Sequence, residues 1–459
     1  LYDLGHLLEV ISGFDNLKNA VKSFSPENVS PIVKIESSKI KSLAEDFAKA
    51  KSAVCYARMG ASTQEFGGLC IWLSNVLNII TGNFDSEGGA MFTLPAFDHV
   101  GFTGSQGKTG LFGNRKTRVK GLPAYGGEFP ISTLIDELTT EGEGQIKGMV
   151  TIAGNPVLSA PNGKALDEAF EDLEFMVSFD IYLNETTRHA DLIIPPTTGL
   201  ETPHYDLIFN TLAVRNTTKY SPALFEKTDE QRHDWQIYKA LTARFTEQPE
   251  DDSTPEKTLA FALKNGPYGR QGIDLEKVKN SPNGIDLGPM KPMLPNRLFT
   301  KDKKIQIAPE FYLNDLPRLA SKLNQNGNSE YPFSLIGRRD LRSNNSWMHN
   351  SLRLVKGKNR CTLLIHPNDA KSVGIEDNQS VLVTSRVGSV EIPAEISDSM
   401  MEGVVSIPHG WGHSKKGIKM EVAEAHAGVS INDLTDTEFI DELTGNAAFS
   451  GVGVRVDII

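Results

Sequence analysis

Three short apolar runs, separated by turn and helix signals, constrain the fold of this chain most strongly. Met149–Ala153 and Phe175–Phe179 have the length and composition of buried strands, and Leu192–Ile194 forms a third just before two prolines. Between the first two runs, Asn162 can cap a helix whose apolar residues, from Leu166 onward, share one face. Strands that alternate with amphipathic helices predict an α/β domain with a parallel sheet wrapped by helices.

The N-terminal part combines helical and strand-like patterns. Apolar residues recur at helical spacing from Ser38 onward, and Ala53–Ala57 has the composition of a short buried strand. The apolar run from Phe66 to Ile80 is too long for a strand. It predicts a helix that is buried on several sides and ends at Gly82.

The C-terminal part has a different residue pattern. Closely spaced prolines and glycines after Glu247 indicate a connector with little regular structure. Short strands rich in β-branched residues follow, joined by tight glycine turns, and this pattern favours a closed barrel over an open sheet. The expected strands are Phe333–Gly337, Cys361–Ile365, Val381–Arg386, Val390–Ile396, Val404–Ile407 and Val452–Ile458.

Composition narrows the class of protein. The 459 residues are 39% hydrophobic and 23% charged, as in globular chains, and no apolar stretch approaches the roughly 20 residues of a membrane span. A net charge of −11 argues against nucleic-acid binding. Three scattered cysteines fit neither a disulfide framework nor a zinc knuckle, so a reducing, cytoplasmic location fits best, with an exported form as the open alternative.

Two neighbouring strand ends carry candidate ligand-binding residues. Gly154-Asn155-Pro156 ends the first predicted strand and precedes a helix, where backbone N–H groups and the helix dipole can hold a phosphate. The alternative for this tripeptide is an ordinary turn. Asp180 ends the next strand and can accept hydrogen bonds from a guanine edge or a ribose, or else serve as a helix N-cap. Together the two positions favour a nucleotide crevice.

The barrel segment carries two further polar clusters. The glycine-rich stretch from His409 to His413 cannot be a zinc-binding helix, and it suits either close approach to a flat heterocycle or a plain hairpin turn. A donor cluster follows the first barrel strand and can bind a pyrophosphate, with a solvated basic edge as the alternative. Its members are Arg338, Arg339, Arg342, Ser343, Asn344 and Asn345.

Several ordered motifs resemble one known family. They are Arg58-Met59-Gly60-Ala61-Ser62-Thr63-Gln64-Glu65-Phe66, Asn78-Ile79-Ile80-Thr81-Gly82-Asn83, Glu87-Gly88-Gly89, Gly154-Asn155-Pro156, Asp180 to Thr186, Ala190 to Pro195, His366 to Ala370, Ile407 to Gly412 and Asn432-Asp433-Leu434-Thr435. This set resembles the dimethyl sulfoxide reductase superfamily of bacterial molybdopterin oxidoreductases, formate dehydrogenase-like enzymes that bind two molybdopterin guanine dinucleotides. The resemblance covers essentially the whole chain.

The resemblance implies a fold and a domain division. It implies an α/β fold in which a doubly wound, mostly parallel sheet domain is followed by a double-psi β-barrel. Residues 1–50 would be a helical remnant of a preceding domain, 51–247 the α/β domain, 248–330 an irregular connector, and 331–459 the dinucleotide-binding barrel.

The resemblance also implies roles for individual residues. Gly154, Asn155, Asp180 and Asn184 would hold one guanosine end, with Asp180 facing guanine, while Arg342, Asn344, His409 and Asn432 would contact pterin and pyrophosphate from the barrel. Thr63 and Gln64 match a loop near the cofactor. The remaining cofactor-binding candidates are Pro156, Asp191, Arg338, Ser343, His349, Gly410 and Trp411. We expect the two polar regions to face each other, with Asp180 and His409 bordering one shared cavity.

The catalytic residues themselves cannot be named from this sequence. The family's metal ligand and iron–sulfur motif would lie upstream of Leu1, which indicates a chain that begins inside a larger gene product, although an arbitrary starting point is the alternative. Lys120 falls about where formate-oxidising relatives carry arginine beside the substrate, which makes formate a less favoured substrate.

The resemblance implies a molybdenum or tungsten enzyme that performs two-electron chemistry on a small molecule, with an iron–sulfur relay and an electron-transfer subunit as partners. Two other classes stay open. One is a cofactor-free structural subunit with the same fold, and the other is a stand-alone nucleotide-binding module.

Overall fold

The structure is a computed structural model that describes residues 2–108, 110–322 and 330–459. Its contacts divide the chain into two compact units. Unit 1 comprises Leu1–Tyr56, Trp72–Thr109 and Pro196–Leu316, and unit 2 comprises Ala57–Ile71, Gly110–Pro195 and Pro317–Ile459.

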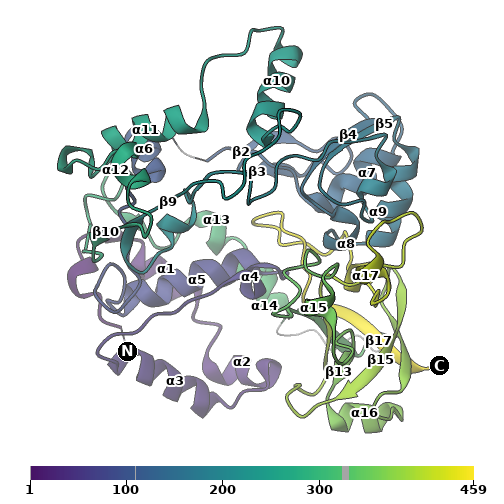
Figure 1. Cartoon of the computed structure of the whole chain (residues 1–459). Helices are drawn as coiled ribbons and strands as arrows, with labels where there is room; N and C mark the ends of the chain where they lie inside the picture. The colour runs from purple at the N-terminus through teal and green to yellow at the C-terminus, as the bar shows by residue number, and fades with distance from the viewer. Residues whose placement is uncertain (1, 109, 323–329) are drawn as a thin grey trace. The chain divides into compact units, whose positions relative to one another are not determined.

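A closed six-stranded barrel forms the C-terminal part of unit 2 (Figure 1). Its strands, in hydrogen-bonded order, are β12 (Phe333–Arg338), β16 (Val404–Pro408), β13 (Leu363–Ile365), β15 (Ser389–Ile396), β14 (Ser380–Thr384) and β17 (Val452–Ile458). Strands β12 and β16 run parallel, as do β13 and β15, and β17 closes the barrel by pairing antiparallel with both β12 and β14. Alternate residues of β17 are buried, so its β-branched side chains fill the barrel core. The predicted closed barrel is confirmed.

The α/β part of unit 2 is a three-stranded sheet with short helices packed on it (Figure 1). Strands β4 (Gly148–Ile152), β5 (Phe175–Phe179) and β6 (Leu192–Ile193) are parallel, as the sequence predicts. Helix α9 (Gly163–Ala169) begins after Asn162, whose side chain accepts a hydrogen bond from the Ala165 backbone N–H at 3.4 Å. The expected cap therefore starts the expected helix. The fold of the chain is mixed α/β with a closed barrel.

Smaller elements complete unit 2. They are α4 (Met59–Ser62), β2 (Phe112–Lys116), β3 (Pro123–Tyr125), α7 (Leu134–Thr139), α8 (Pro156–Ser159), α15 (Leu352–Val355), α16 (Pro367–Val373) and α17 (Glu421–Glu424). Helices α7, α8 and α9 share an apolar cluster with the side chains that precede β4 and β5. This cluster packs the three helices against the side chains at the start of those two strands.

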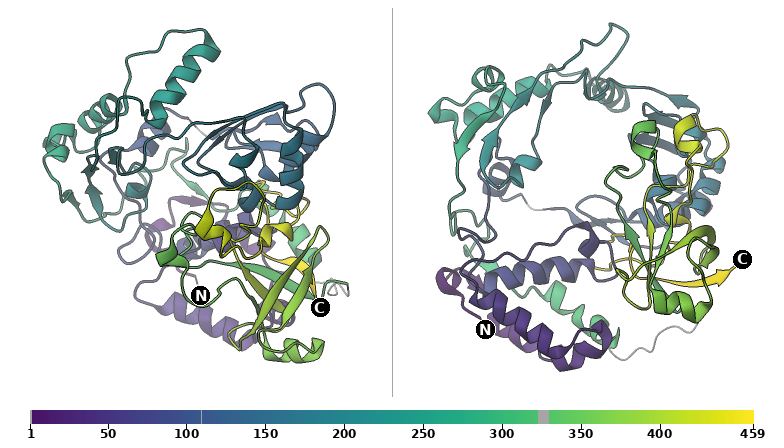
Figure 2. Two further views of the ribbon diagram at one scale, coloured as in Figure 1. Left: turned by 45° about the vertical axis from the view of Figure 1, so that its right-hand side comes forward. Right: turned by 60° about the horizontal axis from the view of Figure 1, so that its bottom comes forward.

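Unit 1 is mainly helical. Its helices are α1 (Phe14–Ala20), α2 (Pro26–Val33), α3 (Ser37–Lys49), α6 (His99–Ser105), α10 (Asp234–Thr246), α11 (Pro255–Asn265), α12 (Leu275–Lys279) and α13 (Glu310–Leu313). Helices α2 and α3 lie side by side (Figure 2). Three two-stranded pairs accompany them: β1 (Ile11–Ser12) with β11 (Ile305–Gln306), β7 (His204–Tyr205) with β9 (Tyr220–Ser221), and β8 (Asn216–Thr218) with β10 (Ile285–Gly288).

The long apolar run forms helix α5 (Gly67–Ile80), as predicted. Leu69, Trp72, Val76 and Ile79 are buried, which agrees with a helix covered on several sides. The Trp72 ring stacks on Tyr312 with centroids 5.1 Å apart, and its indole N–H donates to the Ile307 carbonyl at 3.0 Å.

Two expectations for the secondary structure are wrong. Ala53–Ala57 forms no strand, because the Asn78 side chain, rather than a neighbouring strand, bonds both the N–H and the carbonyl of Cys55. The described part of segment 248–330 is also more regular than expected, since it carries α11, α12, β10 and α14 (Leu316–Lys322). Residues 323–329 of that segment lie outside the described residues. None of the described helices combines the length and apolarity that crossing a membrane requires.

Candidate functional site

A cavity of about 650 Å³ opens inside unit 2. We term it the main cavity. Its lining comes from the segment around α4, from the turn after β4, and from loops of the barrel. Nine predicted site residues line it, namely Thr63, Gly154, Asn155, Arg339, Asn344, Asn345, His409, Gly410 and Asn432. The cavity therefore brings together a strand end of the α/β layer and the barrel loops, as the sequence indicates.

The turn after β4 gives the main cavity an open backbone wall. A Cβ added at Gly154 would have no neighbour nearer than 3.6 Å, so the backbone here faces free space. The Asn155 amide is fixed from both sides, because its Nδ2 donates to Glu185 Oε2 at 2.7 Å and its Oδ1 accepts from the Thr186 hydroxyl at 2.7 Å. One expectation needs correction, since helix α8 behind this turn has only four residues and its dipole is correspondingly small.

The barrel loops supply donors and a neutral imidazole. Gly410 has φ +99°, and a Cβ there would collide with the Asn345 carbonyl oxygen, so only glycine lets the two loops approach this closely. Asn344 and Asn345 both adopt left-handed backbone conformations. Burial and the nearby Arg339 guanidinium lower the pKa of His409 to about 4, so His409 is neutral at pH 7.

Asn432 ties the barrel to the α/β layer at the main cavity. Its side chain is fully buried, its Nδ2 donates to the Leu158 carbonyl at 2.7 Å, and its Oδ1 accepts from the Thr435 hydroxyl at 3.1 Å. Leu158 lies in α8, directly after the turn that carries Asn155. The Asn432 side chain therefore links the barrel wall of the cavity to its α/β wall.

A second cavity, of about 350 Å³, lies elsewhere in unit 2. The predicted residues Arg342, Ser343, His349 and Trp411 line it. The His349 ring packs on Trp411 with centroids 4.2 Å apart. The predicted site residues of the barrel are thus divided between two cavities.

Six predicted cofactor-binding residues line neither cavity. Asp180 accepts hydrogen bonds from the Tyr182 N–H and from Asn184 Nδ2, and burial raises the pKa of Asp180. Asp191 accepts from the Met176 N–H at the start of the sheet. Asp180 is not among the residues that line the main cavity, contrary to the expectation that Asp180 and His409 border one cavity. His409 lines it together with the turn after β4, whose Ala153 N–H donates to the carbonyl of Phe179, the residue before Asp180.

The other members of this group also have local partners. Arg338 donates to the carbonyls of Ser406 and Thr362 within the barrel, and the neighbouring Arg339 lines the main cavity in its place. Gln64 donates to Ala61 and Cys70, and Pro156 begins α8. Asn184 Oδ1 accepts from the backbone N–H groups of residues 186 and 187.

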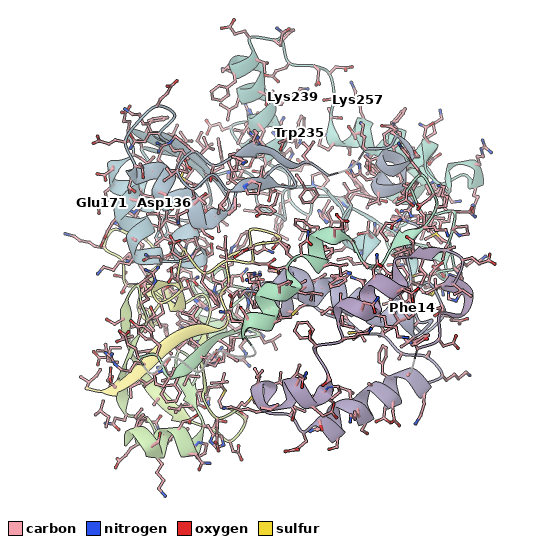
Figure 3. All side chains as sticks on the ribbon, turned by 180° about the vertical axis from the view of Figure 1, so that it is seen from behind. Phe14, Asp136, Glu171, Trp235, Lys239 and Lys257 are labelled. Carbon is pink, nitrogen blue, oxygen red and sulfur yellow. The ribbon has the colours of Figure 1, made fainter. Side chains whose placement is uncertain are left out.

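Lys120 lines neither cavity and forms ion pairs instead. Its ammonium lies 2.9 Å from Asp136, on α7 and labelled in Figure 3, and 2.6 Å from Glu438. The side chain expected beside a substrate therefore has two carboxylate partners.

Sequence reasoning missed several lining residues. Ser159, Phe449 and Ser450 line the main cavity without having been singled out. Ser450 arrives there through a parallel bridge to Gln64, a pairing across almost the whole chain that no local pattern announces. Glu185 and His413 lie within two of the sequence motifs but were given no role of their own, and both are wholly buried and joined by a 2.8 Å hydrogen bond. A carboxylate at the centre of an otherwise neutral, threonine-rich turn was the available signal for Glu185.

The fold and the main cavity define a class of protein. They combine a strand-end turn, a closed barrel and amide, imidazole and guanidinium donors, an arrangement suited to an elongated polar cofactor with phosphate groups. A family model for molybdopterin oxidoreductases matches residues 24–244, and one for the molybdopterin dinucleotide-binding domain matches residues 333–453. The chain belongs to the dimethyl sulfoxide reductase superfamily of molybdopterin oxidoreductases.

Individual relatives agree with this family. A probable oxidoreductase of Bacillus subtilis, YoaE, is 24% identical over 98% of this chain and 63% of its own length. Formate dehydrogenase H of Escherichia coli is 25% identical over 90% of this chain and 58% of its own length. The structure of acetylene hydratase from Pelobacter acetylenicus superposes with a TM-score of 0.73 at 17% identity, covering 100% of this chain and 68% of that one. The chain therefore spans less than two thirds of the length of these two curated relatives.

The family implies a molybdopterin cofactor that carries molybdenum or tungsten. The main cavity fits such a group in three respects. Its volume lies within the usual range for ligand pockets, its wall at Gly154 is open backbone, and Arg339 with the asparagines supplies donors for a pyrophosphate. Among the described residues, no group of three or more His, Cys, Asp or Glu side chains is placed to hold a bare metal ion.

Proposed function

We propose that this chain holds molybdopterin guanine dinucleotide in the main cavity and forms the cofactor-binding part of a molybdenum or tungsten oxidoreductase. One observation carries the proposal: residues from the strand-end turn and from the barrel loops, far apart in sequence, line one cavity with polar donors and open backbone. The substrate would be a small molecule that undergoes two-electron oxidation or reduction. An electron-transfer subunit is the partner that such chemistry calls for.

The residues of the main cavity have distinct tasks in this proposal. Arg339, Asn344 and Asn345 bind the pyrophosphate, because guanidinium and amide donors match phosphate oxygens. The neutral His409 contacts the pterin as either donor or acceptor. When bound, the cofactor holds the metal through its soft sulfur ligands and supplies the redox chemistry.

Finer features of the family belong to the same proposal. We propose two dinucleotides per chain, a doubly wound sheet, a double-psi barrel, and the domain division at residues 50, 247 and 330. An iron–sulfur cluster elsewhere in the whole protein and a cytoplasmic location are further parts of it. Cys55, Cys70 and Cys361, all described in the structure, form no disulfide, which is consistent with that compartment.

A cavity-filling substitution tests the proposal. In Gly154→Leu the added side chain projects into open space in the main cavity without displacing backbone. We expect the content of molybdenum or tungsten and of pterin in protein purified from its native host to fall at least tenfold. Gly199→Leu is the matched control, because a Cβ at Gly199 also has no neighbour within 4 Å but lies in unit 1, and it should leave the cofactor content unchanged.

The same measurement separates the alternatives. A structural subunit without cofactor would contain no molybdenum, tungsten or pterin even in the unaltered protein, and that result would refute the proposal. A nucleotide-binding module would bind guanosine nucleotides in calorimetry and still lack metal and pterin after native expression.

A further inference from the structure

Four buried side chains of unit 2 form one unbroken line of hydrogen bonds. Ser343 Oγ lies 2.8 Å from His349 Nε2, His349 Nδ1 lies 2.8 Å from His413 Nε2, and His413 Nδ1 lies 2.8 Å from Glu185 Oε1. Each of the four side chains is at most 2% exposed. They come from three separate segments of the chain, so the fold assembles the line rather than local sequence.

The two ends of this line reach different cavities. Ser343 and His349 line the second cavity. At the other end, Glu185 Oε2 accepts from Nδ2 of Asn155, which lines the main cavity. A buried line of groups that can both donate and accept protons therefore connects the two cavities.

With both imidazoles neutral, the four groups have two fully bonded arrangements. With Glu185 ionised, every bond points toward it: Ser343 donates to His349, His349 Nδ1–H donates to His413, and His413 Nδ1–H donates to Glu185. With Glu185 protonated, every bond is reversed, both imidazoles carry the proton on Nε2, and Ser343 accepts. The two arrangements differ by one proton and one charge.

We propose that Ser343, His349, His413 and Glu185 form a proton wire that carries one proton between the second cavity and Glu185 beneath the main cavity. A hydronium ion at the second cavity gives its proton to Ser343 Oγ, and the serine proton passes to His349 Nε2. The Nδ1 proton of His349 passes to His413 Nε2, and the Nδ1 proton of His413 passes to Glu185. One proton enters, none leaves, and the carboxylate becomes a carboxylic acid.

The surroundings of His349 keep this imidazole neutral at pH 7. Burial, together with the neighbouring His413, lowers the pKa of His349 to about 4, so this imidazole relays a proton instead of storing one at pH 7. The charged groups that act on His349 are Asp340, which follows β12, and Arg360, which precedes β13, and their effects oppose each other. His413 is bonded to Glu185 and His349.

The wire matters for function only if the proposed cofactor occupies the main cavity, and to that extent it rests on the proposed function. Reduction of a bound group would add negative charge, and a proton taken up by Glu185, which is hydrogen-bonded to the cavity-lining Asn155, would offset one unit of it. The test below uses cofactor-free protein, so its failure is distinct from failure of the cofactor proposal.

The test reads the imidazole tautomers of the full 459-residue chain, labelled with ¹⁵N-histidine, from two-bond ¹H–¹⁵N spectra. At pH 8 we expect His349 and His413 both to carry their proton on Nδ1. In Glu185→Gln, Asn155 Nδ2 holds the amide oxygen, so the amide NH₂ faces His413 and becomes a donor. We expect both imidazoles to switch to Nε2–H, including His349, which does not touch residue 185.

The same spectra serve for a control variant and for the outcomes that would contradict the wire. Glu402→Gln alters an exposed carboxylate 3.9 Å from His366 and should leave His349 and His413 unchanged. A Glu185→Gln protein in which His413 switches and His349 does not would overturn the wire. Acid titration of the unaltered chain gives a second reading that does not depend on a variant folding: both imidazoles should change at one midpoint, and midpoints more than one pH unit apart would overturn the proposal.

Discussion

Asn78 shows how one buried side chain can take the place of a neighbouring strand. Its Oδ1 accepts from the Cys55 N–H at 2.7 Å, and its Nδ2 donates to the carbonyls of Cys55 and Ser74 at 2.9 and 3.0 Å. Asn78→Ala leaves both backbone groups of Cys55 without partners. We expect the free energy of unfolding to fall by about 2 to 4 kcal/mol in urea titrations.

The matched control for Asn78 is Asn265. It makes the same kind of bond to a carbonyl four residues earlier, at 2.8 Å to Phe261, but its side chain has no hydrogen bond to a distant segment among the described residues. Asn265→Ala should change the free energy of unfolding by less than about 0.5 kcal/mol. Equal losses for the two variants would contradict the role given to Asn78.

The lowered pKa of His409 predicts that the free energy of unfolding decreases in acid. Its folded-state pKa of about 4 lies below its usual 6.5, so between these values the unfolded chain binds a proton that the folded chain does not. The unfolding free energy is unaffected by His409 above pH 6.5 and falls as the pH drops from 6.5 to 4.

Removing the imidazole should remove that part of the pH dependence. His409→Gln should reduce the loss of unfolding free energy between pH 7 and pH 4.5 by about 1 to 3 kcal/mol, measured by urea titration at each pH. The exposed His426 provides the comparison, and His426→Gln should follow the unaltered chain. A His409→Gln curve parallel to that of the unaltered chain would rule out a depressed pKa.

At the scale of elements, the loop from His409 to His413 depends on close backbone approach. Gly410 and Gly417 have nearly the same φ, +99° and +98°, but a Cβ at Gly410 would strike the Asn345 carbonyl whereas one at Gly417 would meet nothing within 4 Å. Gly417→Ala should cost about 1 to 2 kcal/mol from its left-handed backbone alone. Gly410→Ala should cost at least about 2 kcal/mol more, as measured by thermal unfolding. Similar costs would show that the two loops separate easily.

The elements also show what local sequence could and could not predict. Short runs rich in β-branched residues predicted all six barrel strands. Five of the strands bury alternate residues in the barrel core, whereas β16 buries four consecutive residues. Asn162 was predictable as a helix cap, because capping depends on residues within a single turn. The missing strand at Ala53–Ala57 was not predictable, since its backbone bonds a side chain more than 20 residues away on another element.

The candidate site was predictable where a short sequence motif forms a turn at the end of a strand. Gly154, Asn155, His409 and Gly410 line the main cavity, and each belongs to a glycine-containing turn after a strand. Which of Arg338 and Arg339 would line the main cavity was not predictable, because the carbonyls of Ser406 and Thr362 that hold Arg338 lie far from it in sequence. Long-range pairing of the kind that brings Ser450 to Gln64 leaves no local trace.

At the scale of the whole molecule, each compact unit has a hydrophobic core of its own. Leu263 is fully buried in the core of unit 1, and Leu335 is fully buried in the barrel core of unit 2. Chains with more than one core often do not unfold in a single step. We therefore expect calorimetry to resolve two thermal transitions, one for each unit.

Matched core truncations assign these transitions. Leu335→Ala and Leu263→Ala remove the same atoms from wholly buried positions, and each should destabilise its own unit by about 2 to 5 kcal/mol. Leu335→Ala should lower the midpoint of only one transition, and Leu263→Ala only that of the other. Because the main cavity lies entirely in unit 2, cofactor loading should raise the transition that Leu335→Ala lowers. A single transition that both truncations shift equally would mean that the two cores unfold as one.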